Sequence, residues 1–350
     1  AENHFPGQLF INFIFTADIF RLYNKLMEAF MKILILDAAT FGEDIDISRF
    51  NTLGEVTVYA ESTKEEALER LKAVNPDAVI TNKVVIGKDE MQAAPELKII
   101  LEAATGYNNI DIECARTYNI RVANVAGYST MSVVQHTFAL FFYLYEKMRY
   151  YDDYVKSGEY SKSTIFTNFS NVFDELAGKT WGIVGLGHIG SRVADAARAF
   201  GCKVVYYSAS GNTYDTEYEK VDLDTLLKES DIISIHAPLN QYTKALFNYE
   251  NLKKMKKSAY LINVGRGPIV NDADLAKALN EGEIAGAGLD VLTTEPMPVD
   301  NPLLAIKDSN KLVITPHNAW ATYEARVRLL DEIYNNLNSF INGEERNLVV

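Results

Sequence analysis

Cysteine is scarce in this chain, and the two that occur are not placed to cooperate. Cys114 and Cys202 are the only cysteines among 350 residues, and neither has a second thiol or a histidine at ligand spacing. This excludes a disulfide scaffold and a cysteine zinc site, and we expect no metal site at all. Separate thiols suit a reducing compartment, so we expect a cytoplasmic protein in which both cysteines are small core residues.

Positive charge is also in short supply. Lys and Arg total 34 against 47 Asp and Glu, which gives a net charge of -13 and a pI near 5.0. A nucleic-acid partner needs a dense Lys/Arg surface, so this balance argues against nucleic-acid binding. We interpret the one basic cluster as a solvated helix face, because a single short run cannot follow a phosphate backbone. Its members are Lys253, Lys254, Lys256 and Lys257.

Long hydrophobic runs are missing as well. No apolar stretch reaches the roughly 18 residues that a transmembrane helix needs, so we expect no membrane partner. The apolar residues 9–20 are interrupted by Asn12 and Asp18, and no Lys or Arg precedes them, which argues against a secretory signal. We interpret residues 1–30 as an appended N-terminal extension, with an extra amphipathic helix as the alternative.

The chain does contain a regular alternation of strands and helices from Met31 onward. The spacing of Thr63 and Glu66 is that of a capping box and predicts a helix from there to Val74. Such alternation is typical of a doubly wound α/β fold, with a parallel sheet between two layers of helices. Strands are expected at residues 32–36, 56–59, 78–81, 98–101 and 122–124.

A second series runs from Trp181 to about Pro316. Between the two series, residues 131–150 are expected to form one long helix that bridges two domains, and a last helix over 321–340 is expected to return to the first. We therefore predict two doubly wound parallel-sheet domains with a cleft between them. The first domain would comprise residues 31–130 plus 318–350, and the second domain residues 131–317.

A glycine-rich motif lies directly after the first strand of the second series. The strand Trp181-Gly-Ile-Val184 is followed by Gly185-Leu-Gly187-His-Ile-Gly190, then by a helix to Phe200 and a strand over residues 203–207. The glycines allow a tight turn, close approach of a pyrophosphate and close packing of helix on strand. The helix N-terminus offers N–H groups to the phosphates, so we predict a dinucleotide cofactor.

The second strand of such a motif usually ends in an acid that binds the adenosine ribose and repels a 2′-phosphate. Ser208 stands there instead, and no Arg follows it to hold a 2′-phosphate. The sequence therefore leaves NAD and NADP open. We favour NAD because no cationic side chain is expected near the position of the 2′-phosphate of NADP.

Three charged side chains follow strands of the second series. Arg266 lies between two glycines after the strand at 261–264, and its planar guanidinium matches a carboxylate. His317 follows the strand at 312–316 and could donate a proton to a developing alkoxide. Glu295 would orient the imidazole and favour its protonated form. These residues predict hydride transfer to or from C2 of a small 2-keto or 2-hydroxy acid.

Six segments together resemble the D-isomer-specific 2-hydroxyacid dehydrogenases, and the resemblance extends from Met31 to the C-terminus. They are Gly185–Gly190, His236-Ala-Pro-Leu239, Asn263-Val-Gly-Arg266-Gly, Gly288-Leu-Asp290-Val, Glu295-Pro296 and Thr315-Pro-His317. The resemblance implies a flavodoxin-like substrate domain, a Rossmann cofactor domain and a homodimer. Arg266 would bind substrate, His317 would be the acid/base, and Glu295 would pair with it.

The resemblance also implies the remaining site residues. Those implied to bind the cofactor are Gly185, Gly187, His188, Ile189, Gly190, Ser208, His236, Ala237, Pro238, Thr243, Val264, Gly265, Arg266, Asp290, His317 and Ala319. Those implied to bind substrate are Asn82, Lys83, Thr105, Gly106 and Tyr107, together with Arg266 and His317.

Residues 124–130, 316–322 and 324–326 look most like the glycerate dehydrogenase/hydroxypyruvate reductase branch. D-3-Phosphoglycerate and D-lactate dehydrogenases share the motifs and are the enzymatic alternatives. Formate dehydrogenases of this fold are less similar, since they have Gln where Glu295 stands. The corepressors called C-terminal-binding proteins are an alternative of another class, because they keep the same motifs yet bind peptides.

Overall fold

The computed structural model describes residues 30–214 and 216–350, so the expected extension at the N-terminus lies outside the described residues but for its last residue. The chain divides into two compact units. Unit 1 holds the residues up to Tyr128 together with Arg326–Val350, and unit 2 holds Ser129–Ala325. The second division falls later than the expected position after residue 317, because backbone and side-chain hydrogen bonds hold residues 317–319 to unit 2.

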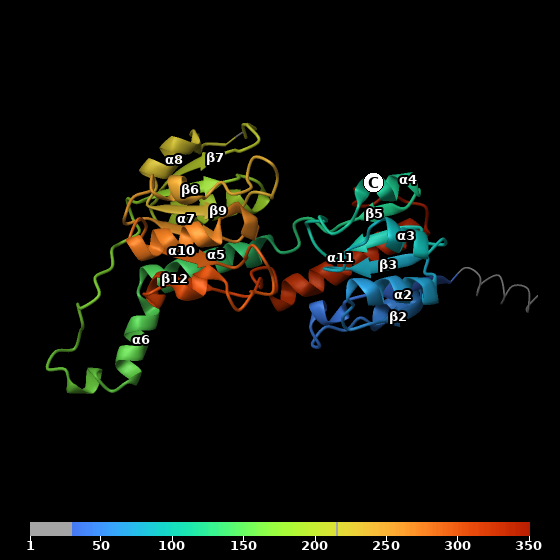
Figure 1. The fold of residues 1–350 in the computed structure, drawn as a ribbon, viewed down its shortest axis with the longest axis horizontal. Helices are drawn as coiled ribbons and strands as arrows, with labels where there is room; N and C mark the ends of the chain where they lie inside the picture. Colours follow the sequence, from blue (N-terminus) through green and yellow to red (C-terminus); the bar gives the residue numbers. More distant parts are fainter. Residues whose placement is uncertain (1–29, 215) are drawn as a thin grey trace, which may run out of the picture. The chain divides into compact units, whose positions relative to one another are not determined.

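Unit 1 contains a five-stranded parallel sheet (Figure 1). Its strand order, β2-β1-β3-β4-β5, is the flavodoxin-like order, as predicted. The strands are β1 (Met31–Ile35), β2 (Gly54–Val58), β3 (Ala78–Thr81), β4 (Ile99–Glu102) and β5 (Arg121–Ala123). The helices are α2 (Lys64–Val74), α3 (Lys88–Ala93), α4 (Ile112–Thr117) and most of α11 (Tyr323–Ile341).

Two local predictions for unit 1 are confirmed. Thr63 caps α2, and its hydroxyl and the Glu66 carboxylate exchange hydrogen bonds with each other's backbone N–H groups. The C-terminal segment returns to this unit: the Val122 N–H donates to the carbonyl of Val350 at 3.0 Å, and the Val349 N–H donates to the carbonyl of Val122 at 2.7 Å.

Unit 2 contains a seven-stranded parallel sheet in the order β12-β11-β10-β9-β6-β7-β8. Counted from β6, this is the Rossmann order 3-2-1-4-5-6 with one further strand, again as predicted. The strands are β6 (Thr180–Val184), β7 (Lys203–Tyr207), β8 (Glu219–Lys220), β9 (Ile232–Ile235), β10 (Tyr260–Asn263), β11 (Gly286–Leu289) and β12 (Leu312–Ile314). Its helices are α5 (Thr130–Tyr145), α6 (Met148–Lys156), α7 (His188–Ala199), α8 (Leu223–Glu229), α9 (Tyr249–Leu252) and α10 (Asp272–Glu281).

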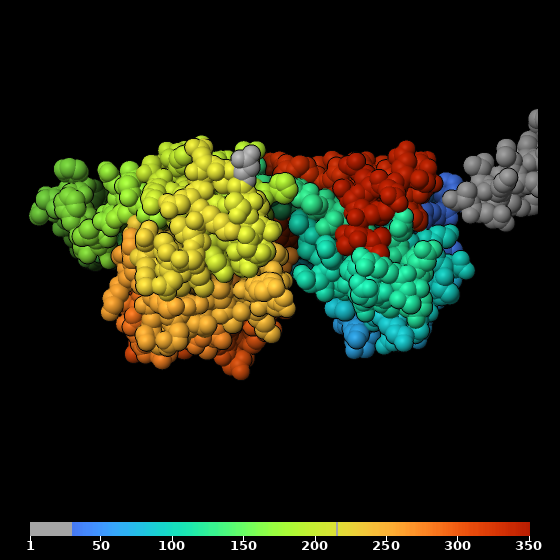
Figure 2. Space-filling model, turned by 90° about the horizontal axis from the view of Figure 1, so that it is seen from above, coloured from blue at the N-terminus to red at the C-terminus, as the bar shows by residue number. Residues whose placement is uncertain are grey.

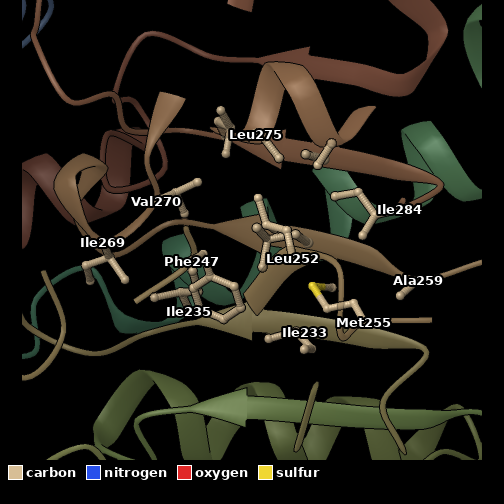
Figure 3. Close-up of a cluster of buried hydrophobic side chains, with 14 of the residues drawn as sticks. Ile233, Ile235, Phe247, Leu252, Met255, Ala259, Ile269, Val270, Leu275 and Ile284 are labelled. Atoms are coloured by element: carbon tan, nitrogen blue, oxygen red, sulfur yellow. The ribbon is translucent and has the colours of Figure 1, made fainter. Parts of the chain in front are cut away.

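Both faces of this sheet are covered by helices. On one face, Phe247, Leu252 and Leu275 gather over Ile233 and Ile235 of β9 (Figure 3). The opposite face packs against α5 and α7 through a separate cluster of buried side chains around Trp181. Burial on both faces explains why the strands are continuous apolar runs. Because the strands pair in parallel, the carboxyl ends of β6, β9, β10, β11 and β12 lie on one rim of the sheet.

The single long helix expected over residues 131–150 is wrong. It is two helices, α5 and α6, separated where Lys147 takes a left-handed backbone conformation with φ of 54°. Both belong to unit 2, so this stretch does not bridge the units. Sequence alone suggested one helix because apolar residues continue past the break, but α5 is packed against α7 and the sheet while α6 has no buried residue.

Other surface features can be compared with expectation. The basic cluster lies in the turns after α9 rather than on a helix, and three of its four lysines pair with acids: Lys253 with Glu250, Lys254 with Asp224 and Lys256 with Asp231. Cys202 is buried as expected, whereas Cys114 is half-buried. In residues 30–214 and 216–350, no helix has the length and hydropathy to cross a bilayer.

Candidate active site

The glycine loop joins β6 to α7. Gly185 has a φ of +90°, which side chains rarely adopt, and a Cβ on Gly190 would lie 2.1 Å from the carbonyl oxygen of Gly185. A Cβ on Gly187, by contrast, would meet nothing within 4 Å. The three glycines thus perform the turn, the close packing and the open approach that the sequence predicted. The N-cap of α7 is Gly187, which has no side chain to cap the helix, so the N-terminal N–H groups and the helix dipole can face a pyrophosphate.

The end of β7 holds Ser208, the position at which the sequence predicts the choice between NAD and NADP. Ser208 is buried, and its hydroxyl lies 3.2 Å from that of Ser210. Lys220 of β8 reaches the same loop: its ammonium donates to the carbonyl of Gly211 at 2.6 Å and to the hydroxyl of Thr213 at 3.2 Å. The expectation that no cation lies near this loop is therefore wrong. Sequence could not reveal it, since Lys220 reaches the loop through a strand pairing.

His236 follows β9 and is neutral at physiological pH. Burial lowers its pKa to about 3. The Trp181 indole donates to the Ser234 hydroxyl at 2.8 Å, and that hydroxyl lies 2.9 Å from Nε2 of His236. Because the indole only donates, the Ser234 hydroxyl can use its own O–H to donate a hydrogen bond to Nε2, and the ring proton then lies on Nδ1. His236 is therefore unsuited to supply protons to a reaction near neutral pH.

The loop after His236 is held by its own side chains. The Thr243 hydroxyl, almost fully buried, donates to the carbonyl of Pro238 at 2.7 Å and accepts from the N–H of Asn240 at 2.9 Å. Thr243 thus shapes this loop rather than offering a free group. Ala237 packs against the glycine loop, because a Cβ on Gly185 would lie 2.9 Å from its Cα.

Arg266 is held between two close backbone approaches. A Cβ on Gly267 would lie 1.8 Å from the carbonyl oxygen of Leu292, and one on Gly265 would lie 3.0 Å from that of Ala237. Asn263, fully buried, donates from its amide to the carbonyl of Arg266 at 3.0 Å. Within the described residues the guanidinium donates only from Nη1 to the carbonyl of Gly265 at 2.8 Å. Its other N–H groups can therefore meet a carboxylate.

Glu295 and His317 form the ion-pair geometry expected from the sequence. Nδ1 of His317 lies 2.7 Å from Oε2 of Glu295, and Oε1 of Glu295 accepts from the N–H of Leu292 at 2.9 Å. The carboxylate is thus anchored in the segment that Gly267 touches. Both side chains are partly exposed, at 23% for His317 and 32% for Glu295. With Nδ1 engaged, Nε2 is the ring atom that can exchange a proton with a ligand.

Asp290 shapes the backbone beneath His317. Its side chain is only 1% exposed, and its oxygens accept from the N–H groups of Asn318 and Ala319, each at 2.9 Å, and from the hydroxyl of Thr315 at 2.7 Å. His317 itself has a φ of 53°, a costly conformation for a residue with a side chain. Its N–H donates to the carbonyl of Asp290 at 2.8 Å. The carboxylate that sequence assigned to the cofactor surface is thus engaged within the protein.

The substrate residues expected in unit 1 gather at the ends of β3 and β4. The Asn82 amide is buried and donates to the carbonyl of Ala103 at 3.1 Å, while Lys83 is exposed. Thr105 and Tyr107 are exposed, and the N–H groups of residues 105–107 donate no hydrogen bond within the described chain. Three free N–H groups in one loop can receive a carboxylate.

Two buried acids of unit 1 escaped the sequence analysis. Asp37 accepts from the N–H groups of Asn82, Lys83 and Val84 and so organises the loop after β3. Burial raises the pKa of Asp37, against the opposing effect of these N–H groups. Burial also raises the pKa of Glu102 at the end of β4 to about 9, so this carboxyl is protonated at neutral pH. A carboxylate at the end of a buried strand or within two residues of it was the available signal in both cases.

The rim of the unit 2 sheet thus combines a dinucleotide loop, a guanidinium and an imidazole paired with a carboxylate. A guanidinium can bind a carboxylate and polarise a neighbouring carbonyl, and an imidazole can exchange the proton of an alkoxide. In the described ranges, no group of three or more His, Cys, Asp or Glu could hold a metal ion. These features define a nicotinamide-dependent oxidoreductase built on two parallel-sheet units.

Comparison with known proteins identifies the family. Residues 138–319 match the model for the D-isomer specific 2-hydroxyacid dehydrogenase, NAD binding domain. The hydroxypyruvate reductase of Blautia hydrogenotrophica is 37% identical over 325 residues, which cover 91% of this chain and 99% of the relative. The glycerate dehydrogenase of Methylorubrum extorquens is 37% identical over 319 residues, covering 91% and 98%. A solved acyclic imino acid reductase in complex with NADPH and D-Arg has a TM-score of 0.81 and 31% identity, covering 91% and 100%.

The chain belongs to the D-isomer-specific 2-hydroxyacid dehydrogenase family. It is an NAD-binding oxidoreductase of that family, and the predicted family and fold class are confirmed.

Proposed function

We propose that this enzyme interconverts hydroxypyruvate and D-glycerate. The observation that carries the proposal is the Glu295–His317 pair beside the loop that holds Arg266, on the same rim as the glycine loop. The choice of substrate is supported by the names of relatives at 37% identity, a hydroxypyruvate reductase and a glycerate dehydrogenase. D-Lactate and D-3-phosphoglycerate dehydrogenase activities are the alternatives that the same residues could support.

In the proposed mechanism Arg266, His317 and Glu295 have different tasks. The nicotinamide, when bound, supplies or accepts the hydride at C2 of the substrate. Arg266 binds the substrate carboxylate and polarises the C2 carbonyl, which a planar fork of N–H donors does well. His317 donates a proton from Nε2 to the oxygen on C2 during reduction and accepts it during oxidation. Glu295 orients the ring through Nδ1 and stabilises its charged form.

The loop of residues 105–107 would bind the substrate carboxylate through its backbone N–H groups, since none of them has a partner among the described residues. Lys83, exposed at the end of β3, would add positive charge beside that carboxylate. Asn82 would contribute by holding the loop rather than by touching substrate, because its amide already donates to Ala103.

One panel tests the proposed substrate. Initial rates are measured with NADH and with NADPH against hydroxypyruvate, glyoxylate, pyruvate and phosphohydroxypyruvate. The proposal expects the highest kcat/KM with hydroxypyruvate. A higher value with phosphohydroxypyruvate or pyruvate would replace it with one of the two alternatives. No measurable turnover with any of the four would overturn 2-keto acid reduction altogether.

For the coenzyme, we infer that NAD(H) is used and that NADP(H) is also accepted. Ser208 carries no charge to repel a 2′-phosphate, and the ammonium of Lys220 lies in the loop that follows it. The imino acid reductase of similar structure was solved with NADPH. Both observations support a weaker preference for NAD(H) over NADP(H) than the sequence suggested.

We also infer a cytoplasmic homodimer. Helix α6 and the segment after it project from the body of unit 2 (Figures 1 and 2). The segment exposes large apolar side chains, with Phe166 at 89% and Phe169 at 76%. Exposed apolar groups of this size are typical of a protein interface, and a second copy of the chain is the partner we propose. Two free thiols, Cys114 and Cys202, fit a reducing compartment.

A further inference from the structure

Helix α5 contacts the segment that presents His317 at two points. The Ser132 hydroxyl donates to the carbonyl of Ala319 at 2.5 Å. Nε2 of His136 lies 2.9 Å from the hydroxyl oxygen of Thr315 and 3.4 Å from Oδ1 of Asp290. Because Ser132 and His136 are four residues apart, they lie on one face of the helix. The segment from 315 to 319 is thus held on both sides of His317.

The hydrogen positions of this network follow from its partners. The Thr315 hydroxyl donates its single proton to Asp290 at 2.7 Å, so its oxygen can only accept from His136. The Asp290 carboxylate, when charged, can likewise only accept. Nε2 of His136 must therefore carry a proton and share it between Thr315 and Asp290. This selects one tautomer of a half-buried imidazole.

Hydrogen bonds connect this network to the backbone around His317, the proposed acid/base. Asp290 accepts from the N–H groups of Asn318 and Ala319 with its side chain and from the N–H of His317 with its carbonyl. These bonds maintain the left-handed backbone of His317. A rotation of the Asp290 carboxylate would release the N–H groups of Asn318 and Ala319, the two residues that follow His317, at once. His136 and Thr315 contact Oδ1 of that carboxylate, the same oxygen that accepts from the N–H of Asn318.

We propose that His136 is a positioning residue for the reaction: through Thr315 and Asp290 it sets where the imidazole of His317 lies. The proposal rests on the proposed role of His317. The Nε2–H of His136 restrains the carboxylate, the carboxylate restrains the backbone, and the backbone aims the ring. A displacement of about 1 Å at a reacting group can lower a rate by roughly 10²-fold, so the effect should be seen in catalysis.

The test compares His136→Leu with His136→Gln. Leu removes the donor, whereas the Gln amide can place an N–H near the former Nε2. We expect His136→Leu to lower kcat by roughly ten- to a hundredfold with little change in the dissociation constant of NADH, and Gln to restore most of the loss. The isotope effect on kcat with deuterated NADH should rise in the Leu variant as the chemical step becomes limiting. An unchanged kcat in His136→Leu, or a loss that Gln fails to restore, would overturn the proposal.

Thr315→Val gives a second route that does not depend on His136→Leu folding. It removes the hydroxyl between His136 and Asp290, so kcat should fall to a similar extent. If both variants fold, the double variant should be little worse than either single one, because the two residues act through one hydrogen bond. Losses that multiply would contradict the proposal. Measuring His317→Ala in parallel distinguishes a failure of the proposed function from a failure of the role of His136. If His317→Ala is inactive while His136→Leu is normal, only the positioning role of His136 is wrong.

Discussion

Arg266 is the residue whose shape matters most to the proposed chemistry. Its guanidinium presents a planar fork, whereas an ammonium is a point charge with the same sign. We expect Arg266→Lys to lower kcat/KM for hydroxypyruvate by roughly 10²-fold, because a donor aimed at the carbonyl is lost. Arg149→Lys, an exposed change on α6, is the matched control. Steady-state rates that are equal for Arg266→Lys and its control would remove Arg266 from the mechanism.

Ser208 tests the coenzyme inference at the scale of one side chain. Ser208→Asp places a negative charge where a 2′-phosphate would lie, so the ratio of kcat/KM for NADH to that for NADPH should rise by roughly ten- to a hundredfold. Ser208→Asn has a similar size without the charge and should shift the ratio much less. Equal shifts in the two variants would show that size, not charge, governs this position.

Single residues were predictable from sequence where the residue type is uncommon and where neighbouring glycines or a preceding strand indicate its position. Arg266 lies between glycines, and His317 directly follows a strand, so both could be named in advance. Asp290 was named as part of the cofactor surface, but its oxygens serve the loop around His317. His136 was not named at all. Its partners lie far along the chain, and only the packing of α5 on β11 and β12 brings them together.

At the scale of elements, the end of β4 carries a buried carboxyl group, that of Glu102, which is protonated at neutral pH. Glu102 is fully buried, its Oε1 has no hydrogen-bond partner among the described residues, and its pKa rises to about 9 from an ordinary 4.5. Between these pH values the folded state binds a proton that the unfolded state releases. The stability contributed by this group is therefore complete below about pH 4.5 and is lost as the pH rises toward 9.

Glu102→Gln should remove that pH dependence. The wild type should lose about 1.4 kcal/mol of unfolding free energy per pH unit through this window from Glu102 alone, whereas Gln cannot ionise. Urea titrations at pH 5.5 and pH 8.5 measure the difference. Glu96→Gln changes an exposed carboxylate of the same unit and controls for the loss of a surface charge. If the variant and wild type keep the same gap in stability at both pH values, Glu102 is not a buried neutral acid.

Strand and helix positions were largely predictable because parallel strands are buried on both faces and read as apolar runs. β3 and β7 have the predicted bounds, and the other predicted strands differ at their ends by two residues at most. The break between α5 and α6 was not predictable, since Lys147 in a left-handed conformation carries no mark in the sequence. Helix α5 ends there because its packing against α7 and the sheet ends, and that packing depends on the fold rather than on local helix propensity.

At the scale of the whole molecule, the two-unit architecture followed from two successive strand–helix series. The division near residue 325 did not, because it depends on the hydrogen bonds that Asp290 and Ser132 make to residues 318 and 319. Strand order could be anticipated only through family resemblance, since many orders satisfy the same alternation. Both sheets have the orders that the resemblance implied.

The proposed homodimer makes a prediction at this scale. The double change Phe166→Asp with Phe169→Asp should convert a dimer into a monomer, because two charges cannot be buried in an apolar interface. Light scattering coupled to gel filtration measures the mass. Val299→Asp, at a 97% exposed position in unit 2, is the control and should remain dimeric. A wild-type chain that is monomeric at micromolar concentration, or a double variant that stays dimeric, would contradict this assignment.

The central claim is that the imidazole of His317, held by Glu295, exchanges the proton at the C2 oxygen. The most direct measurement is the single-turnover rate of NADH oxidation by hydroxypyruvate in His317→Ala, with the dissociation constant of NADH measured on the same sample. We predict a rate lower by roughly 10²–10⁴-fold and an unchanged dissociation constant. A near-normal rate in a variant that still binds NADH would contradict the account.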